Sequence, residues 1–200
     1  MKLSRVAAAF DHPDFVFELK HDGFRCLAYI SESRCDLVSS RNNNHYKSFD
    51  SLKTALAKLK VENAILDGEI VCLDSEGKSR FNLLFRRRAE PVFYAFDLLW
   101  LNGKDLRGLP LVERKIRLRK LIEKSDCERI IYTQHIEMRG CVLYRAICKK
   151  DLEGIVCKKK DGSYSVSGQW LKVLNPNYTQ HEDRHEIFTA LQSRAGRVST

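Results

Sequence analysis

The stretch Glu18-Leu19-Lys20-His21-Asp22-Gly23-Phe24-Arg25 is a charged segment between two runs of apolar residues. Phe15, Phe17 and Leu19 alternate with other residues before it, and apolar residues continue from Cys26 to Ile30 after it. This pattern predicts two strands that meet at a glycine turn. A charged cluster at such a turn usually faces a cleft, so the segment predicts both a bend in the fold and a functional site.

Lys20 is a candidate nucleophilic amine within this segment. An amine attacks only when it is unprotonated, so a nucleophilic lysine needs a pKa lowered by partial desolvation or by nearby cations. A phosphate-binding pocket supplies both conditions. The alternative interpretation of these eight residues alone is a hairpin tip whose charges are solvated, because short motifs recur by chance.

The alternation of apolar and polar residues predicts a mixed fold dominated by strands. The expected strands are 14–21, 25–31, 35–40, 64–73, 92–101, 129–133, 154–159 and 169–174. Helical spacing is seen at 49–59, 111–122 and 142–147. The strands and helices do not alternate regularly, which favours an α+β fold with largely antiparallel sheets and packed helices. We expect one domain over residues 1–178, followed by a polar tail, 179–200, that contains a short helix.

The composition indicates a globular protein with an anionic partner. Of the 200 residues, 44% are hydrophobic, enough for one substantial core. The 35 Lys and Arg against 26 Asp and Glu give a formal charge of +9, which favours nucleic acid, with a membrane surface as the weaker alternative. Basic residues cluster at 86–88, at 114–120, and at 149–150 with 158–160. For 114–120 we expect a solvated helix face.

The cysteines and the N-terminus predict a cytoplasmic protein. There are seven cysteines, an odd number without close CxxC pairs, which argues against a disulfide framework or a zinc ribbon. No stretch has the length of a signal peptide or a membrane-spanning segment, so we expect no membrane association.

Acidic and basic residues on the later strands predict an ion site. Asp67 and Glu69 are two residues apart on an apolar strand and so point to one face. Such carboxylates need a partner, which could be Mg²⁺, a ribose hydroxyl or a basic side chain, or else they form a structural ion pair. Three lysines on neighbouring strands would form a positive cluster that suits a triphosphate: Lys20, Lys158 and Lys172. Glu69 and Glu153 would be placed to hold the accompanying Mg²⁺. Phe96 could stack on a purine, although spacing alone favours core packing.

Taken in order, these segments resemble the signature motifs of ATP-dependent DNA ligases, which belong to the covalent nucleotidyltransferases together with RNA ligases and capping enzymes. The segments that carry the resemblance are 18–25, Ser40-Arg41-Asn42, Asp67-Gly68-Glu69, Phe96-Asp97-Leu98-Leu99, Glu153-Gly154-Ile155-Val156 and Trp170-Leu171-Lys172. The stretch 96–115 is especially similar to bacterial ligases linked to end joining. The resemblance spans nearly the whole chain and implies a covalent nucleotidyltransferase (ATP-grasp-like) adenylation domain that uses ATP and Mg²⁺.

The resemblance also implies roles for individual residues. Lys20 would attack the α-phosphate of ATP, release pyrophosphate, and pass AMP to the 5′-phosphate of nicked or broken DNA. Glu18 would read the adenine amino group and Phe96 would stack on the base. The remaining roles are ribose or phosphate contacts by Arg25, Arg41 and Glu69, metal binding by Glu69 and Glu153, phosphate binding by Lys158 and Lys172, and shaping of the site by Asp22 and Asp67.

Three departures from the family pattern leave alternatives open. Asn43 stands where the family usually has glycine, and Leu174 stands where a second lysine of the last motif is usual. The chain also ends soon after that motif, without the OB-fold domain of other ligases, so a separate OB-fold or end-joining protein is an expected partner. The alternatives are an RNA ligase or capping-type nucleotidyltransferase, or a degenerate, non-catalytic nucleotide- or DNA-binding protein.

Overall fold

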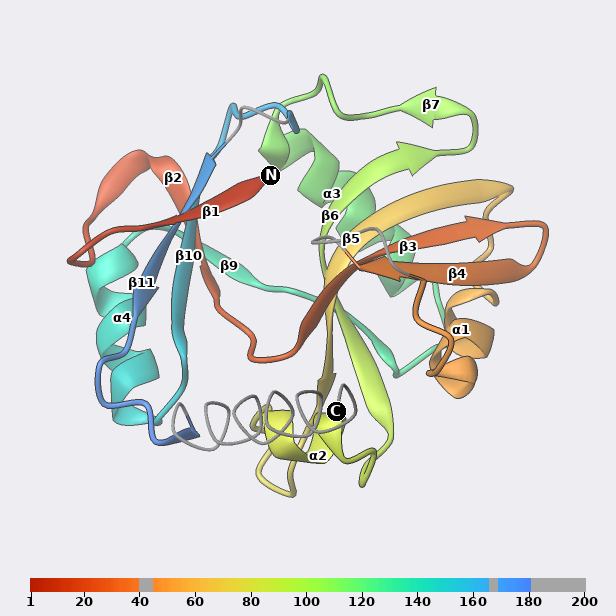
Figure 1. Ribbon diagram of the computed structural model, residues 1–200. Coiled ribbons are helices and arrows are strands. Elements are labelled where there is room, and N and C mark those ends of the chain that lie inside the picture. The colour runs from red at the N-terminus through yellow and green to blue at the C-terminus, as the bar shows by residue number, and fades with distance from the viewer. Residues whose placement is uncertain (40–44, 166–168, 181–200) are drawn as a thin grey trace, which may run out of the picture.

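The computed structural model describes residues 1–39, 45–165 and 169–180, which form two sheets with helices packed around them (Figure 1). Sheet A consists, in spatial order, of β1 (Lys2–Arg5), β11 (Gln169–Leu174), β10 (Gly154–Lys159), β2 (His12–Leu19) and β9 (His135–Met138). Sheet B consists of β4 (Arg34–Ser39), β3 (Phe24–Ser31), β5 (Asn63–Cys72), β6 (Pro91–Leu101) and β7 (Lys104–Asp105), and β8 (Ile130–Tyr132) pairs with β6.

Antiparallel pairing dominates both sheets. Among the strands of the described chain, only β1 with β11 and β6 with β8 pair in parallel. The helices are α1 (Asp50–Leu56), α2 (Phe81–Phe85), α3 (Leu111–Glu123) and α4 (Gly140–Lys149). The predicted α+β fold with largely antiparallel sheets is therefore confirmed.

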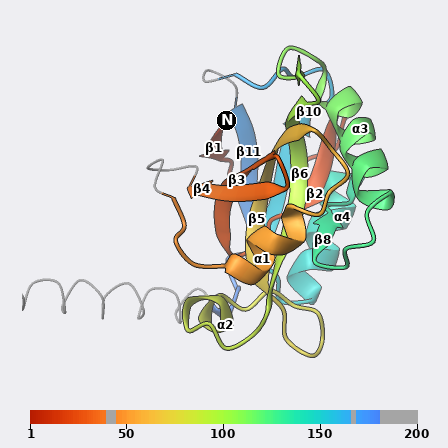
Figure 2. The ribbon, with the colours of Figure 1, turned by 90° about the vertical axis from the view of Figure 1, so that its right-hand side faces the viewer.

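The helices lie around the two sheets, and α3 contacts both of them. In Figure 1, α4 lies outside sheet A and α1 lies beside sheet B, while Figure 2 shows α3 and α4 along the same side of the molecule. One hydrophobic core lies between α4 and sheet A and includes Phe17, Ile147 and Ile155. A larger core joins sheet B to the other helices. A third, small cluster of Phe96, Val156 and Trp170 lies between the two sheets.

The turn predicted at Gly23 is present, but glycine is needed there for close approach. A β-carbon at this position would lie 2.1 Å from the Ile70 carbonyl oxygen on β5 and 2.8 Å from Val71. Contacts this short are sterically forbidden, so any larger residue would push the β2–β3 connection off sheet B. The connection that carries Lys20 therefore lies directly against β5, the strand of Asp67 and Glu69.

A β-bulge in β6 orients the expected stacking residue. Ala95 pairs with Gly68 and Asp97 pairs with Asp67, so Phe96 is an extra residue without a partner across the ladder. A bulge bends the strand and redirects a side chain. Here it directs the Phe96 ring to Trp170 of the opposite sheet, with ring centroids 5.6 Å apart.

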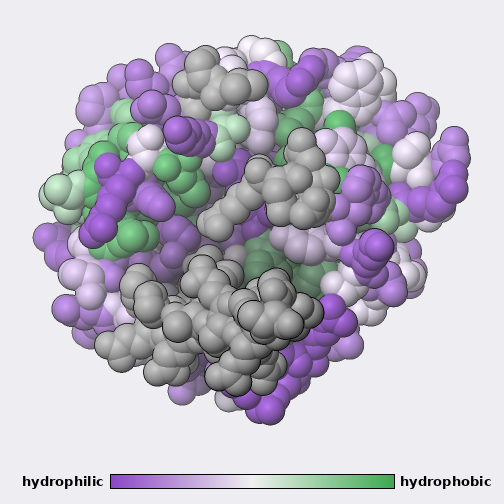
Figure 3. Space-filling view, in the orientation of Figure 1, coloured by the Kyte–Doolittle hydropathy of each residue, from purple (hydrophilic) through white to green (hydrophobic). Residues whose placement is uncertain are grey.

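The face of the molecule seen in Figure 3 is mostly hydrophilic, with a hydrophobic area on its left side where α4 and the β1–β2 connection lie. Among the described residues, no helix is long and apolar enough to cross a membrane. All seven cysteines are free thiols.

Candidate active site

A small cavity between the two sheets collects most of the residues predicted to be functional. It has a volume of about 40 Å³. Its walls are formed by Leu3, Glu18, Leu19, Lys20, His21, Arg25, Glu69, Phe96, Val156, Lys158 and Trp170. These residues come from β1, β2, β3, β5, β6, β10 and β11, and from the connection after β2. Residues distant in the sequence thus meet because the two sheets face each other here.

Lys20 lies inside the cleft beside an acidic residue. Its Nζ is 2.6 Å from Glu153 Oε1, and the two side chains are only 16% and 14% exposed. The backbone N–H of Lys20 donates to the Gly154 carbonyl at 2.9 Å, which fixes the start of the turn against β10. The structure therefore brings Lys20 together with Glu153, as the motifs predicted, and excludes the alternative of a solvated hairpin tip.

Glu69 faces the same space from β5. Burial raises the pKa of Glu69 to about 8; Lys20 opposes this shift, and the negative charge of Glu153 adds to it. Two carboxyl groups near one amine need further positive charge before both can ionise. The arrangement therefore suits a cation in addition to Lys20.

Glu18 lies in a buried cluster with two lysines. Its Oε1 is 2.5 Å from Lys115 Nζ and its Oε2 is 2.6 Å from Lys158 Nζ. Burial alone would raise the pKa of Glu18, but the two ammonium groups outweigh burial and lower it. The carboxylate is therefore ionised, and its hydrogen-bond acceptors point to lysines from two different elements.

Lys158 lies on the aromatic side of the cavity. Its Nζ is 4.4 Å from the centre of the Phe96 ring and 4.0 Å from that of Trp170, and burial lowers its pKa. The lysine is 1% exposed, beside Glu18 and the aromatic rings. Lys172 is half-buried on β11, two positions from Trp170. The two lysines thus do not form one solvent-facing pair.

Arg25 and Asp67 form a bidentate pair across β3 and β5. Arg25 Nε donates to Asp67 Oδ1 at 3.1 Å and a terminal nitrogen donates to Oδ2 at 2.7 Å. The hydroxyl of Tyr164 also donates to Asp67, at 2.9 Å. The guanidinium lies 4.8 Å from the centre of the Trp170 ring. Asp67 therefore holds Arg25 against the aromatic wall of the cavity, a shaping role of the kind the sequence predicted for it.

Asp22 connects the Lys20 turn to the segment after β11. The hydroxyl of Tyr178 donates to the buried carboxylate of Asp22 at 3.1 Å. Beyond Tyr178, Thr179 donates to Asp151 and Gln180 donates to the Ser79 carbonyl at 3.3 Å. The domain boundary expected at residue 178 remains a prediction. The predicted site residue Arg41 and residues 181–200 of the tail lie outside the described part of the chain.

The expectation of a solvated face over 114–120 was wrong for its first two residues. Arg114 is 0% and Lys115 1% exposed. Arg114 forms two hydrogen bonds to the equally buried Asp97, at 2.7 and 2.8 Å, and Lys115 reaches Glu18. A signal was present: the buried residues of α3 are Leu111, Arg114, Lys115, Leu118 and Ile122, which follow helical spacing. Because two of these five residues are charged, the buried face of α3 was not recognised from the sequence.

His21, in the connection after β2, is a buried histidine that should make the stability of the protein depend on pH. Its ring stacks on Tyr94 with centroids 3.9 Å apart, and burial lowers its pKa to about 3. Since unfolded histidine binds a proton near pH 6.5, unfolding takes up a proton between pH 3 and 6.5. The free energy of unfolding should therefore fall as pH decreases, by about 1.4 kcal/mol per unit from this group. We expect His21→Phe to remove that part of the slope in denaturant titrations from pH 6.5 to 4.

The matched control is His12→Phe, since His12 is exposed and its ring also contacts an aromatic neighbour, Phe15. It tests whether a loss of slope is specific to His21 or is a general result of replacing a histidine by phenylalanine. Equal slopes for His21→Phe and the wild type would show that His21 titrates normally and is not held neutral in the folded protein.

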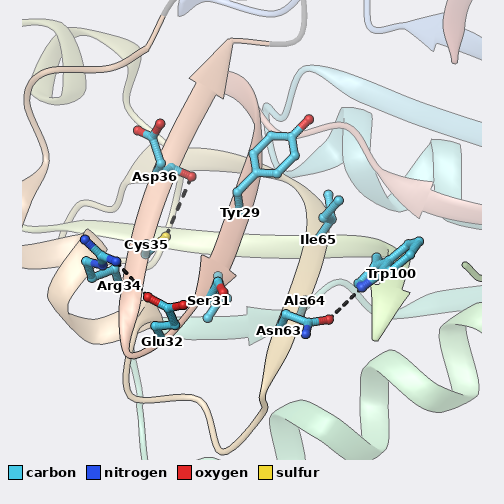
Figure 4. Close-up of a pocket in the computed structure, with 11 residues that line it drawn as sticks. Tyr29, Ser31, Glu32, Arg34, Cys35, Asp36, Asn63, Ala64, Ile65 and Trp100 are labelled. Atoms are coloured by element: carbon cyan, nitrogen blue, oxygen red, sulfur yellow. Dashed lines mark hydrogen bonds and ion pairs between the residues drawn. The ribbon is translucent and has the colours of Figure 1, made fainter. Parts of the chain in front are cut away.

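A second, wider hollow lies elsewhere on the described surface and lacks this chemistry. It has a volume of about 810 Å³ and lies over the ends of β3, β4, β5 and β6 (Figure 4). Among its lining residues Arg34 pairs with Glu32, and the Trp100 indole donates to Asn63 at 2.6 Å. No amine beside carboxylates is among its lining residues, so the smaller cavity is the candidate active site.

Comparison with known proteins agrees with this geometry. A family profile described as "ATP dependent DNA ligase domain" matches residues 2–173. The chain belongs to this family. It is 32% identical over 167 residues to the multifunctional non-homologous end joining protein LigD of Pseudomonas aeruginosa, which covers 80% of this chain and 20% of that protein. It is 28% identical over 189 residues to the SPbeta prophage-derived DNA ligase-like protein LigB of Bacillus subtilis, covering 90% of the chain and 68% of LigB.

A solved structure of the ligase family has the same fold. It is described as mycobacterial DNA ligase D complexed with ATP and MES, and it superposes with a TM-score of 0.76 at 26% identity. The match covers 86% of this chain and 58% of that one. The chain thus corresponds to the adenylation part of the ligase family and spans about a fifth of LigD from Pseudomonas aeruginosa.

Proposed function

We propose that this chain binds ATP between its two sheets, transfers AMP to Lys20 with release of pyrophosphate, and then passes AMP to a DNA 5′-phosphate for strand joining. The observation that carries the proposal is the position of Lys20. Its amine lies within a cleft between the two sheets, beside Glu153 and the cavity that Glu69 also lines. Membership of the ATP-dependent DNA ligase family supports the choice of nucleotide.

The base would bind at the aromatic end of the cleft. Phe96 and Val156 come from opposite sheets and belong to one cluster, so a flat purine can insert between them. Glu18 and Lys158 offer a carboxylate acceptor and an ammonium donor beside the same cluster. We therefore assign Lys158, with Glu18, to the base, in place of the phosphate role expected from the sequence. A cavity of about 40 Å³ is far smaller than a nucleotide site. The cavity must therefore widen when a nucleotide binds.

The phosphates would lie toward Lys20, with Lys172 and Arg25 as basic residues on either side. The acidic residues Glu69 and Glu153 fit Mg²⁺, which binds proteins through one or two carboxylates and completes its shell with water and phosphate oxygens. Bound there, Mg²⁺ would neutralise charge on the phosphate oxygens.

The reaction needs Lys20 to lose a proton before it attacks. Glu153 Oε1, at 2.6 Å, is within reach to accept that proton. The nitrogen lone pair then forms the P–N bond to the α-phosphorus, and the bond from phosphorus to the bridging oxygen breaks, so that pyrophosphate leaves with the electron pair. The packing of the turn at Gly23 against β5 keeps the amine close to the place of reaction, which reduces the entropic part of the barrier.

The proposed acceptor is nicked or broken DNA. The formal charge of +9 favours a polyanion, and the arginines at 86–88 are exposed beyond α2. Relatives named for non-homologous end joining support an end-joining context, in which an OB-fold or end-joining protein would be the partner. Seven free thiols support a reducing, cytoplasmic location.

The direct test is incubation of the full chain with Mg²⁺ and ATP labelled on either the α- or the γ-phosphate, followed by denaturing electrophoresis. We expect the α-label to remain on the protein and the γ-label to be lost. Labelling by GTP in preference to ATP would favour a capping-type enzyme. Absence of label from either nucleotide would favour a non-catalytic binding protein. A panel of nicked DNA and RNA duplexes then identifies the acceptor.

Leu174 is a position where activity should be gained. It lies on the same face of β11 as Lys172 and pairs with Gly154, next to Glu153. A lysine there would add positive charge close to the phosphates, which stabilises a transition state that gains negative charge on the leaving group. We expect Leu174→Lys to raise the rate of self-adenylation about tenfold. Single-turnover labelling measures this rate.

The control adds the same charge on the same strand but on the other face. Gln169 is exposed, and its odd position directs it away from Lys172. Gln169→Lys should leave the labelling rate unchanged. Equal gains from both variants would show that the effect comes from net charge and not from a phosphate contact.

A further inference from the structure

Lys115 joins the two residues that are proposed to hold the base. Its Nζ lies 2.5 Å from Glu18 Oε1 on sheet A and donates to the Phe96 carbonyl on sheet B at 3.5 Å. A third hydrogen bond goes to the Thr133 carbonyl at 3.2 Å, and the ring of Tyr132 lies 4.6 Å away. The ammonium group therefore has partners for all three of its N–H donors and is 1% exposed.

The Lys115 side chain approaches the Glu18 carboxylate from outside the cavity. It belongs to α3, and it is not one of the residues that line the cavity, whereas Glu18, Phe96 and Lys158 are. Of the two Glu18 oxygens, Oε1 is taken by Lys115 and Oε2 by Lys158. Lys115 therefore stands behind the carboxylate and Lys158 stands on the cavity side.

We propose that Lys115 is a positioning residue for base selection: it fixes the Glu18 carboxylate at a set distance from the Phe96 ring, so that the carboxylate meets the 6-amino group of the stacked purine. The proposal rests on the proposed ATP site. Glu18 carries three rotatable bonds, and without Lys115 its carboxylate is held from the cavity side alone. It would then swing toward Lys158, and the acceptor would no longer face the edge of the base.

A carboxylate in a fixed place discriminates between purines by one hydrogen bond. A 6-amino group donates to it, whereas purine riboside triphosphate, which lacks that group, leaves the carboxylate without this donor. A hydrogen bond to a charged group changes affinity by roughly tenfold or more. The consequence of misplacing Glu18 should therefore be a loss of selectivity for ATP, with the binding of the analogue little affected.

The test measures equilibrium binding by calorimetry in the Lys20→Ala background, where no covalent product forms. The ligands are ATP and purine riboside triphosphate, each with Mg²⁺. We expect the parent to prefer ATP about tenfold, and Lys115→Met to weaken ATP binding by about the same factor while the analogue changes less than about threefold. Lys120→Met, an exposed lysine on the same helix, is the matched control and should keep the preference.

A double-mutant cycle separates positioning from a general structural effect. If Lys115 acts through Glu18, then Lys115→Met should change the ATP preference less than about twofold when Glu18→Gln is already present. If Lys115→Met does not fold, Lys115→Gln takes its place in the experiment, because the glutamine amide still offers donors to the two carbonyls. The expected result is the same. Melting temperatures of all variants report on the fold.

The inference is overturned if Lys115→Met retains the ATP preference, or if it lowers the affinity for both nucleotides equally with or without Glu18. A parent that shows no preference for ATP, or binds neither nucleotide, also overturns it. Failure of the proposed function looks different. A wild-type protein that binds ATP but is never labelled would refute self-adenylation and leave the role of Lys115 to be decided by the binding data.

Discussion

Lys20→Ala should retain no covalent label from α-labelled ATP, a loss of more than about 10³-fold relative to wild type. The expectation follows from the position of the amine, which is 2.6 Å from Glu153 and lines the cavity between the two sheets where we propose that ATP binds. Alanine removes the nucleophile itself, so no other contact can compensate. Quantitative electrophoresis after a long incubation measures the residual label.

The loss should be chemical and not a failure of binding or folding. Lys20→Ala should still bind ATP, because the base contacts that we propose for Glu18, Phe96 and Lys158 do not involve the missing amine. Lys104→Ala, at an exposed lysine of β7, should label like the wild type. Undiminished label on Lys20→Ala would show that another residue is the nucleophile.

Arg114→Met should lower the free energy of unfolding by about 3–5 kcal/mol. The guanidinium and the carboxylate of Asp97 are both fully buried, and the arginine also donates to the carbonyls of Leu109 and Gly162. Methionine fills similar space but leaves a buried carboxylate without its countercharge, and desolvation of an unpaired ion is costly. Urea titration at neutral pH measures the change.

Two further variants isolate the cause. Arg119→Met removes an exposed arginine that pairs with Glu123 on the same helix, and it should cost less than about 1 kcal/mol. The double variant Asp97→Asn with Arg114→Met should recover part of the loss, because the amide carries no charge to be buried. If both arginine variants cost the same, the buried pair does not support the fold.

Much of the fold followed from the sequence because its strands alternate strongly. The strands β2, β3, β5, β6, β10 and β11 fall where apolar alternation predicted them, with the expected antiparallel arrangement. Short strands give little readable alternation, so β1, β7 and β9 were not predicted, although the three-residue β8 lies within the strand predicted at 129–133. The five-residue helix α2 was missed for the same reason.

The candidate site could be predicted in its membership but only partly in its geometry. Lys20, Glu69 and Phe96 come together as the motifs indicated. The pairing of Lys115 with Glu18 could not be read from the sequence, because 97 positions separate them and only the packing of α3 against sheet B brings them into contact. Charge also misled the interpretation: two basic residues at core positions of a helix were taken for a solvated face.

The most direct test of the account is to locate the adenylate on the protein. After incubation with ATP and Mg²⁺, the wild-type chain is digested and the peptides are analysed by mass spectrometry. The account predicts one peptide heavier by a single adenylate, with the modification on the Lys20 side chain. Adenylate on another residue, or an unmodified Lys20 peptide in a protein that binds ATP, would contradict it.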